Sequence, residues 1–535
     1  MSILLSSATT LFGVAALFTA KHPALSSIAL ISVFGILVLV LITLSIQPMI
    51  AGWFMGDRLR KRTFPITARI FVKTIITWFN IVFIAMILTV MGTLMYYLLP
   101  VRRKWKENAF HRMFCGLSRF YIFLSLPDRS LYNRYGEDFK KPAVIISNHQ
   151  SLIETPALLR LYPKIIILTR TWVHNSIVFG PIARLASFYN VDHGLDAIMD
   201  KLREKVSQGY SILVFPEAHR SKDQSIQRFH RGAFYLAQHL DLDILPLMMF
   251  GTGEFLERGD FWGRPNGFRQ KIFKRITADD ISFGTTYQER SKAIRRYYIL
   301  EYERFRAEQG NASHYRRLLS LNYIYKGPVL EWYMRIKLRL EQNYQLLNEH
   351  VPRQGDILDL GCGYGIVSYM LALTSIHRNI TGIDFDNEKI RVADGGFLKS
   401  PRINFITADI RTFDFLPKDC IILSDVLHYI QPADQEQLLV KCMSNLRPGG
   451  MILIRDADES RAGQHSRARL TEWFSTGMKF NKTSEETARL HFLSTAGLER
   501  IASAAGFSLE IIGSKTYSSN TYYLLKKKSP TALNA

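Results

Sequence analysis

Residues 355–365 read GDILDLGCGYG, an apolar strand pattern that ends in three alternating glycines. The residues from Ile366 onward open a predicted helix. Glycines at a strand–helix junction allow the backbone to approach a bound cofactor closely, and the helix N-terminus attracts negatively charged groups. The stretch therefore predicts a cofactor-binding loop at the start of an α/β domain.

Further strands follow this loop, and each ends in a polar residue. Residues 379–383 end at Asp384, roughly twenty residues past the glycines, where an acid can hold both hydroxyls of a ribose. The other predicted strands and motifs are 403–408 with Asp409, 420–424 with Asp425, and 451–454 after the LRPGG segment 446–450. This βαβ alternation predicts a mostly parallel sheet whose strand ends form a ligand site.

Together these motifs resemble a class I S-adenosylmethionine-dependent methyltransferase over residues 325–527. A nicotinamide dehydrogenase is the competing interpretation of the glycine loop, but the LRPGG segment and Asp409 favour the methyltransferase. The resemblance implies S-adenosyl-L-methionine as cofactor. It assigns Asp359, Gly361, Gly363 and Gly365 to the methionine and ribose side, Asp384 to the ribose hydroxyls, Asp409 and Ile410 to the adenine, and Asp425 and His428 to the methyl-transfer face.

A methyl acceptor that is a phenol or a carboxylic acid would need a base. His428, Asp456 and His465 are the candidates on this side of the domain, although structural roles compete for all three. The Asn-Pro-Pro-aromatic motif of adenine-N6 methylation is missing, and no RNA-binding module is recognisable, so we expect no nucleic-acid partner.

A second chemical motif begins at residues 143–154, which read AVIISNHQSLIE. The β-branched run predicts a buried strand, and His149 follows directly after it. A histidine at a strand end can take a proton from an alcohol, and Glu154 five residues on can fix its tautomer. Taken alone, a loop histidine with a nearby acid is more often structural.

Four more blocks follow in order: FGP at 179–181, YNVDH at 189–193, SILVFPEAHRS at 211–221, and RFHRGA at 228–233 with the strand 244–247. This series resembles the glycerolipid (lysophospholipid) acyltransferase family over residues 110–307. The resemblance implies that His149 deprotonates an acceptor hydroxyl, which attacks an acyl thioester of coenzyme A or acyl-carrier protein. Glu154 replaces the usual Asp as the orienting acid, and Glu217, Arg220 and Ser221 belong to the acceptor-binding motif.

This chain departs from that family at three headgroup positions. Ala218 and His219 replace the usual Gly and Thr, and His193 replaces the usual Arg. Lysophosphatidic acid is therefore not assumed as the acceptor.

The N-terminal hundred residues are mostly apolar. Residues 3–19 and 24–46 predict a helical hairpin, and the second run is long enough to span a bilayer. This hairpin resembles the last two helices of RND-type (MMPL) exporters, but neither run contains the ionisable residues of a proton-driven pump. A third run, 75–99, has basic residues on both sides. We expect a re-entrant or interfacial helical pair there, interrupted near Gly92.

Composition restricts the remaining choices. The chain has 535 residues and a formal net charge of +22, which favours anionic partners such as phospholipid headgroups or acyl carriers. Its 4 cysteines are too scattered for a disulfide framework or a CxxC metal site, which indicates a reducing compartment and no metal.

The predicted fold class is multidomain: N-terminal transmembrane helices, an α/β glycerolipid-acyltransferase-like domain, and an α/β Rossmann-like class I methyltransferase domain. The expected boundaries are 1–50 for the hairpin, 51–109 for a basic linker and membrane helix, 110–307 for the acyltransferase-like domain, 308–354 for a helical linker, 355–527 for the methyltransferase domain, and 528–535 for a tail.

We expect a bifunctional enzyme on the bacterial inner (cytoplasmic) membrane, with both catalytic domains facing the cytoplasm. Its expected partners are membrane lipids, an acyl-carrier protein and an RND/MMPL-type exporter. Two alternatives remain: an exporter accessory subunit that modifies lipid cargo, and a binding protein whose acyltransferase domain is degenerate.

Overall fold

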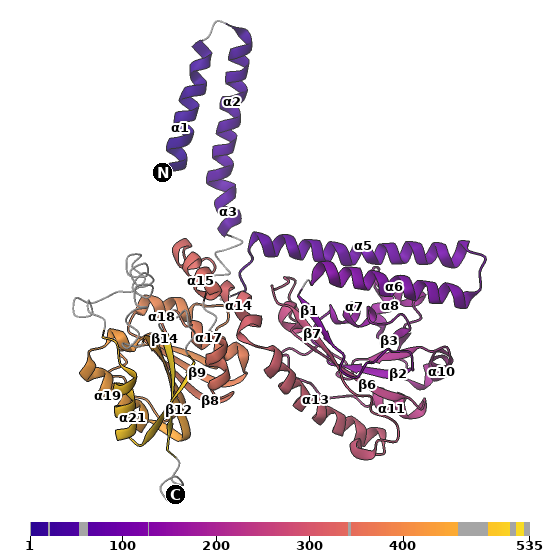
Figure 1. Ribbon diagram of the computed structural model, residues 1–535. Coiled ribbons are helices and arrows are strands. Elements are labelled where there is room, and N and C mark those ends of the chain that lie inside the picture. The colour runs from indigo at the N-terminus through magenta and orange to yellow at the C-terminus, as the bar shows by residue number, and fades with distance from the viewer. Residues whose placement is uncertain are drawn as a thin grey trace, which may run out of the picture.

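Two seven-stranded sheets organise the chain, one in each of the two predicted α/β domains (Figure 1). The computed structural model describes residues 2–19, 22–52, 63–126, 128–340, 344–457, 491–513 and 520–528. We call the half built on the N-terminal sheet the first domain and the half built on the C-terminal sheet the second domain.

The first sheet has the strand order β1-β7-β6-β2-β5-β3-β4, and β6 and β7 are its antiparallel pair. Both central strands β2 and β6 are buried along their whole length, as expected for continuous apolar runs in a covered sheet. The strands are β1 (Arg129–Tyr132), β2 (Ala143–Ser147), β3 (Ile165–Thr169), β4 (Tyr189–Asn190), β5 (Ser211–Val214), β6 (Asp243–Phe250) and β7 (Phe268–Ile272).

Helices cover both faces of this sheet. In Figure 1, α5 to α7 lie above it, and α11 and α13 lie below it. The helices of this half are α5 (Ala68–Leu98), α6 (Arg103–Ser125), α7 (Glu154–Leu159), α8 (Thr171–Asn175), α9 (Gly180–Leu185), α10 (Met199–Ser207), α11 (Gly232–His239), α12 (Thr252–Phe255) and α13 (Tyr287–Gln309).

The second sheet has the order β10-β9-β8-β11-β12-β14-β13, with the parallel strands first and the antiparallel pair β14–β13 at one edge. Its strands are β8 (Gln354–Leu360), β9 (His377–Asp384), β10 (Ile403–Thr407), β11 (Lys418–Ser424), β12 (Leu446–Ala457), β13 (Phe507–Gly513) and β14 (Asn520–Lys527). Its helices are α17 (Ile366–Thr374), α18 (Asn387–Asp394), α19 (Pro432–Ser444) and α21 (Thr495–Ala504). The sequence predicted the positions of β8 to β12 within a few residues.

The hairpin at the N-terminus consists of α1 (Ser2–Ala15) and α2 (Pro23–Leu41), extended by a π-helical turn and α3 (Gln47–Ala51). It projects away from both sheets in Figure 1. Two helical stretches, Pro23–Met49 and Ala68–Leu98, are long and apolar enough to cross a membrane.

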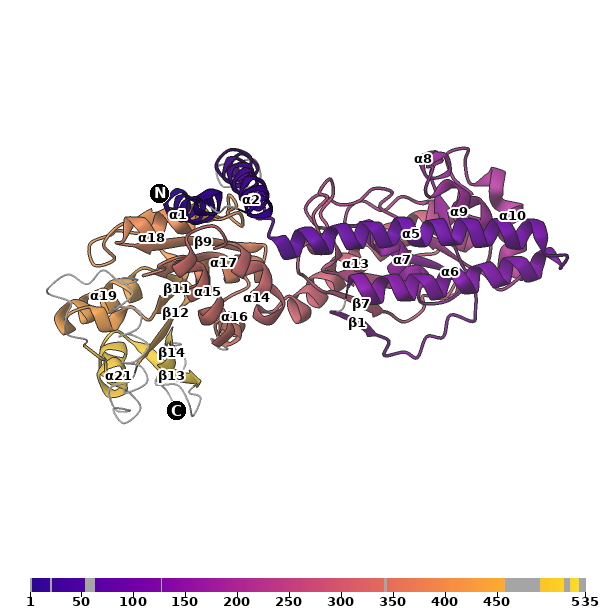
Figure 2. The same ribbon diagram turned by 90° about the horizontal axis from the view of Figure 1, so that it is seen from above.

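The predicted interruption near Gly92 is not present, because α5 is one continuous helix of 31 residues. Gly92 has a packing role instead. A Cβ atom there would lie 2.6 Å from the Phe110 ring of α6 and 2.8 Å from the Leu185 side chain of α9. The missing side chain therefore lets α5 and α6 pack side by side, as Figures 1 and 2 show.

The segment between the domains forms α14 (Ala312–Leu321), α15 (Pro328–Leu340) and α16 (Tyr344–His350). It connects both halves: Tyr323 Oη donates to the Tyr364 carbonyl of the glycine loop at 3.0 Å, and Tyr325 Oη donates to the Ile66 carbonyl at 2.6 Å. One cluster of buried apolar side chains runs from the first domain through these helices to one face of the second sheet. The two domains are therefore packed together and share a core.

Candidate active sites

His149 and Glu154 form a pair at the carboxyl end of β2. His149 Nδ1 lies 2.8 Å from Glu154 Oε2. The imidazole is stacked on Phe215 with ring centroids 4.1 Å apart, and its side chain keeps 19% of its surface exposed, whereas that of Glu154 is fully buried. The structure thus leaves one nitrogen edge of His149 accessible and holds the other against an acid.

The Glu154 carboxylate is held by further donors. The Gln150 backbone N–H donates to both oxygens, at 3.0 and 2.9 Å, and Thr252 Oγ1 donates to Oε1 at 2.6 Å. These bonds satisfy a buried anion and fix its orientation toward His149. The longer Glu side chain therefore still places a carboxylate oxygen within hydrogen-bond distance of His149.

Glu217 is hydrogen-bonded to the backbone of the loop that carries His149. Its Oε1 accepts the His149 backbone N–H at 2.8 Å, and its Oε2 accepts the Gln227 N–H at 2.7 Å. Burial raises the pKa of Glu217 to about 7 although both hydrogen bonds oppose that rise. Glu217 therefore braces two segments of backbone.

The other two predicted acceptor residues lie in the same loop. The Ser221 N–H donates to the His149 carbonyl at 2.8 Å, while its hydroxyl donates to Asp223. Arg220 is partly exposed, and its carbonyl accepts a hydrogen bond from Arg258. Burial, assisted by the Arg258 charge, lowers the pKa of Arg220. Of the predicted acceptor set, Arg220 presents the most accessible charge; its role in phosphate binding stays a prediction.

In the second domain, the glycine loop has the backbone conformation that a cofactor loop requires. Gly361, Gly363 and Gly365 have φ values of 75°, 55° and 75°, a region that side chains disfavour. A Cβ at Gly361 would lie 2.4 Å from Val426 and one at Gly365 would lie 2.6 Å from Phe405, whereas Gly363 faces open space. The loop is therefore closely packed on the protein side and open at Gly363.

Asp384 lies at this opening. It accepts the Gly363 N–H at 2.8 Å and the Asp386 N–H at 2.9 Å. A carboxylate offers about four acceptor positions, so about two remain for a pair of ribose hydroxyls. These residues fit an adenosine-type cofactor. Asp359 is fully buried and accepts from Ser368 Oγ at 2.6 Å; burial raises its pKa to about 6.

The remaining cofactor-side residues lie at the same edge of the sheet. Asp409 forms an ion pair with Arg411 at 2.7 Å, and Ile410 is buried in the second apolar cluster. Asp425 has a positive φ of 55° and pairs with Arg455. All three follow the ends of β10 and β11, as the sequence predicted.

The candidate bases on the methyl-acceptor side are partly placed. His428 Nδ1 is hydrogen-bonded to Asp456, and both residues are buried. The structure thus brings together two of the three candidates. His465 lies outside the described residues. Within the described ranges there is no cluster of three or more His, Cys, Asp or Glu residues that could hold a metal ion.

A basic residue of α15 near Asp425 was not predicted from the sequence. Lys337 Nζ lies 5.8 Å from the Tyr333 ring centroid. Its pKa is raised, chiefly by the Tyr333 phenol and also by Tyr344 and Asp425. A helix in the predicted linker thus contributes a cation to the Asp425 side of the second domain. The available signal in the sequence was a lysine within a partly apolar helix, and no known motif marks such a residue as functional.

Comparisons with known proteins support the same division. A family model described as acyltransferase matches residues 128–250, and one described as a methyltransferase domain matches residues 357–450. A chloroplastic 1-acyl-sn-glycerol-3-phosphate acyltransferase of Arabidopsis thaliana is 28% identical over 169 residues, 30% of this chain and 45% of that protein. Carboxy-S-adenosyl-L-methionine synthase of Aliivibrio fischeri is 25% identical over 116 residues, 21% of this chain and 48% of that protein.

Among solved structures, the 1-acyl-sn-glycerophosphate acyltransferase of Thermotoga maritima aligns with a TM-score of 0.35 and 16% identity, over 43% of this chain and 97% of that chain. The chain spans about half the length of both curated relatives described above. It carries an acyltransferase-like domain followed by a Rossmann-like methyltransferase domain. The methyltransferase matches support binding of S-adenosylmethionine.

Proposed function

We propose that this chain is a membrane-associated bifunctional enzyme. Its first domain transfers an acyl group from a thioester to a hydroxyl of a lipid-like acceptor, and its second domain methylates a lipid or an acyl-chain-related acceptor. The observation that carries the proposal is the pair formed by His149 and the fully buried Glu154 at a strand end. This arrangement also argues against a degenerate acyltransferase domain.

The acyl-transfer step follows from the tautomer that this pair favours. When Nδ1 donates its proton to Glu154, Nε2 of His149 is left as a base. Nε2 takes the proton of the acceptor hydroxyl while the oxygen attacks the thioester carbonyl, and the imidazolium is stabilised by the Glu154 charge. The tetrahedral intermediate then expels the thiolate, which recovers that proton as a thiol, and an ester remains.

Methyl transfer depends on positioning, because S-adenosylmethionine itself supplies an activated methyl group. Asp384 and the open backbone at Gly363 would hold the cofactor, and the Asp425–Arg455 pair and Lys337 would border the acceptor. His428, oriented by Asp456, would remove a proton from an acidic acceptor group.

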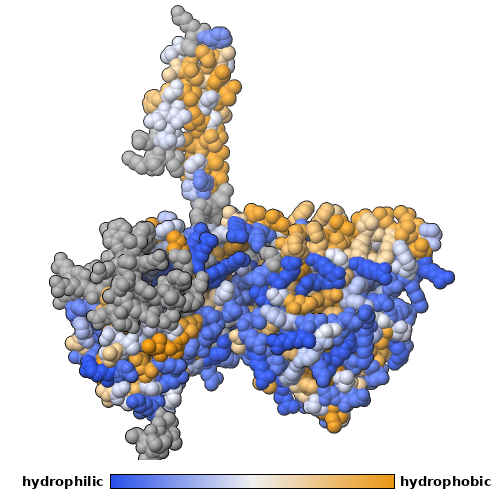
Figure 3. All heavy atoms as spheres, in the orientation of Figure 1, coloured by the Kyte–Doolittle hydropathy of each residue, from blue (hydrophilic) through white to orange (hydrophobic). Residues whose placement is uncertain are grey.

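The proposed membrane contact combines the hairpin with α5. Exposed apolar residues repeat along one face of α5, including Ile76, Phe79, Val90 and Leu94, and Figure 3 shows the apolar surface along its upper edge. The opposite face packs on the first domain through residues such as Leu88. This pattern supports an interfacial helix. We propose that this helix lies on the cytoplasmic face of a bacterial inner membrane, with both catalytic domains on that side. Phe79→Glu with Val90→Glu in a chain without residues 1–62 should abolish binding to lipid vesicles; unchanged binding would contradict this contact.

A second candidate function is that of an accessory subunit of an RND/MMPL-type exporter. The exposed apolar surface of the hairpin favours it, because only 6% of the membrane-spanning part of the helix Pro23–Met49 is buried. In this case α1 and α2 would dock into the exporter, and the soluble domains would modify its lipid cargo. Co-purification with such an exporter, lost on deletion of residues 1–50 alone, tests this candidate. Stable activity of the isolated chain without any exporter would count against it.

Lipid mass spectrometry of cells that carry wild type, His149→Ala or Asp384→Ala tests the main proposal. We expect His149→Ala to lose one acyl chain from a specific lipid, and Asp384→Ala to lose the mass of one methyl substitution from the same or a related lipid. The matched control is His239→Ala, because His239 is exposed and contacts the Tyr235 carbonyl and the rings of Tyr235 and Tyr287 rather than the predicted site residues. An unchanged lipid profile in both site variants would refute the bifunctional assignment.

A further inference from the structure

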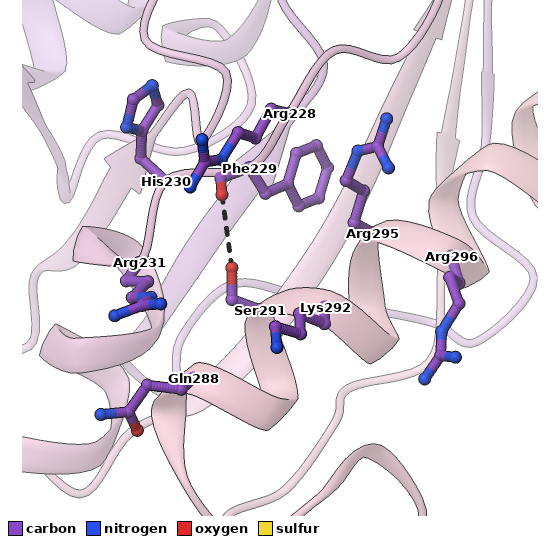
Figure 4. Close-up of a pocket in the computed structure, with 9 residues that line it drawn as sticks. All are labelled: Arg228, Phe229, His230, Arg231, Gln288, Ser291, Lys292, Arg295 and Arg296. Atoms are coloured by element: carbon purple, nitrogen blue, oxygen red, sulfur yellow. Dashed lines mark hydrogen bonds between the residues drawn. The ribbon is translucent and has the colours of Figure 1, made fainter.

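A cavity of about 660 Å³ lies between residues 228–231 and α13, and His149 is not among its lining residues. One wall is the backbone segment 228–231, and the other is the N-terminal half of α13 (Figure 4). Ser291 joins the walls through a 3.5 Å hydrogen bond to the Phe229 carbonyl. Four arginines and one lysine line the cavity, and we call it the arginine pocket: Arg228, Arg231, Lys292, Arg295 and Arg296.

None of these five side chains forms an ion pair within the described part of the chain, although Arg295 is close enough to Glu217 to affect the pKa of that carboxyl. Arg295 donates Nε to the Gln227 carbonyl at 2.9 Å, a neutral acceptor. Like charges gathered in one hollow repel each other unless an anion is bound there. Guanidinium groups from two walls are also suited to grip phosphate bidentately.

A series of hydrogen bonds connects the arginine pocket to the backbone of His149. Arg295 holds the Gln227 carbonyl, Gln227 donates to Glu217, and Glu217 accepts from the His149 backbone. In Figure 1, α13, which forms one wall of the pocket, lies on the side of the first sheet away from α5. A ligand in the pocket would therefore contact a segment that is hydrogen-bonded, through Gln227 and Glu217, to the backbone of His149.

We propose that the arginine pocket binds the phosphate groups of coenzyme A, the thiol carrier of the acyl donor. The inference rests on the proposed acyl transfer and specifies its donor. Coenzyme A carries a pyrophosphate and a 3′-phosphate, enough negative charge to match cations on both walls, and its long flexible arm can extend from the pocket toward His149. Arginine planes also stack on an adenine.

Two other anions fit the observations less well. An acyl-carrier protein presents a single phosphodiester on a convex helical surface, which suits a flat basic patch better than a hollow. An anionic bilayer would meet the molecule at α5, on the opposite side of the sheet. Coenzyme A is a small polyanion that can enter a cavity.

Binding measurements on the full chain in detergent test the proposal. Arg231→Gln with Lys292→Gln removes one cation from each wall, and Lys201→Gln with Arg203→Gln removes the same charge from the exposed face of α10. Titration calorimetry would use coenzyme A and dephospho-coenzyme A, with excess S-adenosylhomocysteine to occupy the second domain. We expect the pocket variant to weaken coenzyme A binding at least about tenfold, because charge-assisted bonds to phosphate are lost. The α10 variant should bind as wild type does, and dephospho-coenzyme A should bind wild type more weakly.

Hydrogen exchange on the wild-type chain provides a readout that needs no variant. Coenzyme A should protect residues 226–231 and 287–297 and leave residues 361–365 unchanged. Equal affinity of both variants for coenzyme A, or protection only at 361–365, would overturn the proposal. If the pocket variant binds holo-carrier protein or anionic vesicles more weakly than wild type does but binds coenzyme A equally well, the proposal would be overturned in favour of that ligand. Because binding is measured without turnover, the result is independent of whether His149→Ala abolishes acyl transfer.

Discussion

Glu154 determines which nitrogen of His149 carries the proton, and this can be tested with one atom changed. In Glu154→Gln, Oε1 still accepts from Gln150 and Thr252, so the new amide N–H₂ replaces Oε2 and points at His149 Nδ1. Nδ1 then accepts, Nε2 keeps its proton, and the base is lost. We expect acyl transfer to fall on the order of 10²–10⁴-fold. Methyl transfer by the same preparation is the control for folding, and near-wild-type acyl transfer would contradict this role.

Asp359 gives a pH dependence at the residue scale. Its pKa rises from 3.8 to about 6 because the carboxyl is buried. Below about pH 4 it is protonated in both states, and above about pH 6 it is ionised in both. Between these values the unfolded chain releases its proton first, so rising pH lowers the stability of the folded wild type.

Asp359→Asn removes this cost and keeps an oxygen for Ser368. Relative to wild type, the variant should therefore gain up to about 3 kcal/mol between about pH 4 and about pH 7.5. Unfolding in urea at both pH values measures the difference. A difference that does not change with pH would refute the assignment of the cost to the ionised carboxylate.

At the scale of elements, Gly92 determines how closely α5 packs on α6. Gly92→Ala places a methyl group 2.6 Å from the Phe110 ring, so we expect a loss of about 1–3 kcal/mol from overpacking. Gly116→Ala in α6 is the matched control, because nothing lies within 4 Å of its Cβ position. The control should gain up to about 1 kcal/mol from helix propensity. Thermal unfolding of both variants should give shifts of opposite sign; equal shifts would refute the packing role.

Much of each site could be predicted because its residues follow strands within short, local motifs. The run 143–154 predicted β2 and placed His149 at its end, and the run 355–365 predicted β8 and the glycine loop. The contribution of Lys337 could not be predicted, because it depends on how α15 packs beside α14 and brings Lys337 near Asp425. Gly92 was misinterpreted for a similar reason: helix propensity treats a glycine as a weak point, whereas here the absent side chain makes room for Phe110.

At the scale of the whole molecule, the shared apolar core couples the two domains. The core cluster continues through α14 to α16, and Tyr323 contacts the cofactor loop from this side. We therefore expect one cooperative unfolding transition for both domains. S-adenosylhomocysteine at a hundred times its Kd should add about 2.7 kcal/mol to the whole unit. Calorimetry should show a single midpoint that moves upward, and two transitions of which only one moves would show that the domains unfold independently.

The continuous helix α5 has a kinetic consequence. Under the proposed membrane contact, the apolar face of α5 would lie in one leaflet. The enzyme and a lipid acceptor would then diffuse in the same two-dimensional layer, and they would meet according to the number of acceptors per lipid molecule. Dilution of the acceptor with inert phospholipid should then slow acylation even when its bulk concentration is constant. The rate would still depend on the bulk concentration of the soluble donor. The two substrates of one reaction would therefore be governed by different concentrations, one per membrane area and one per volume.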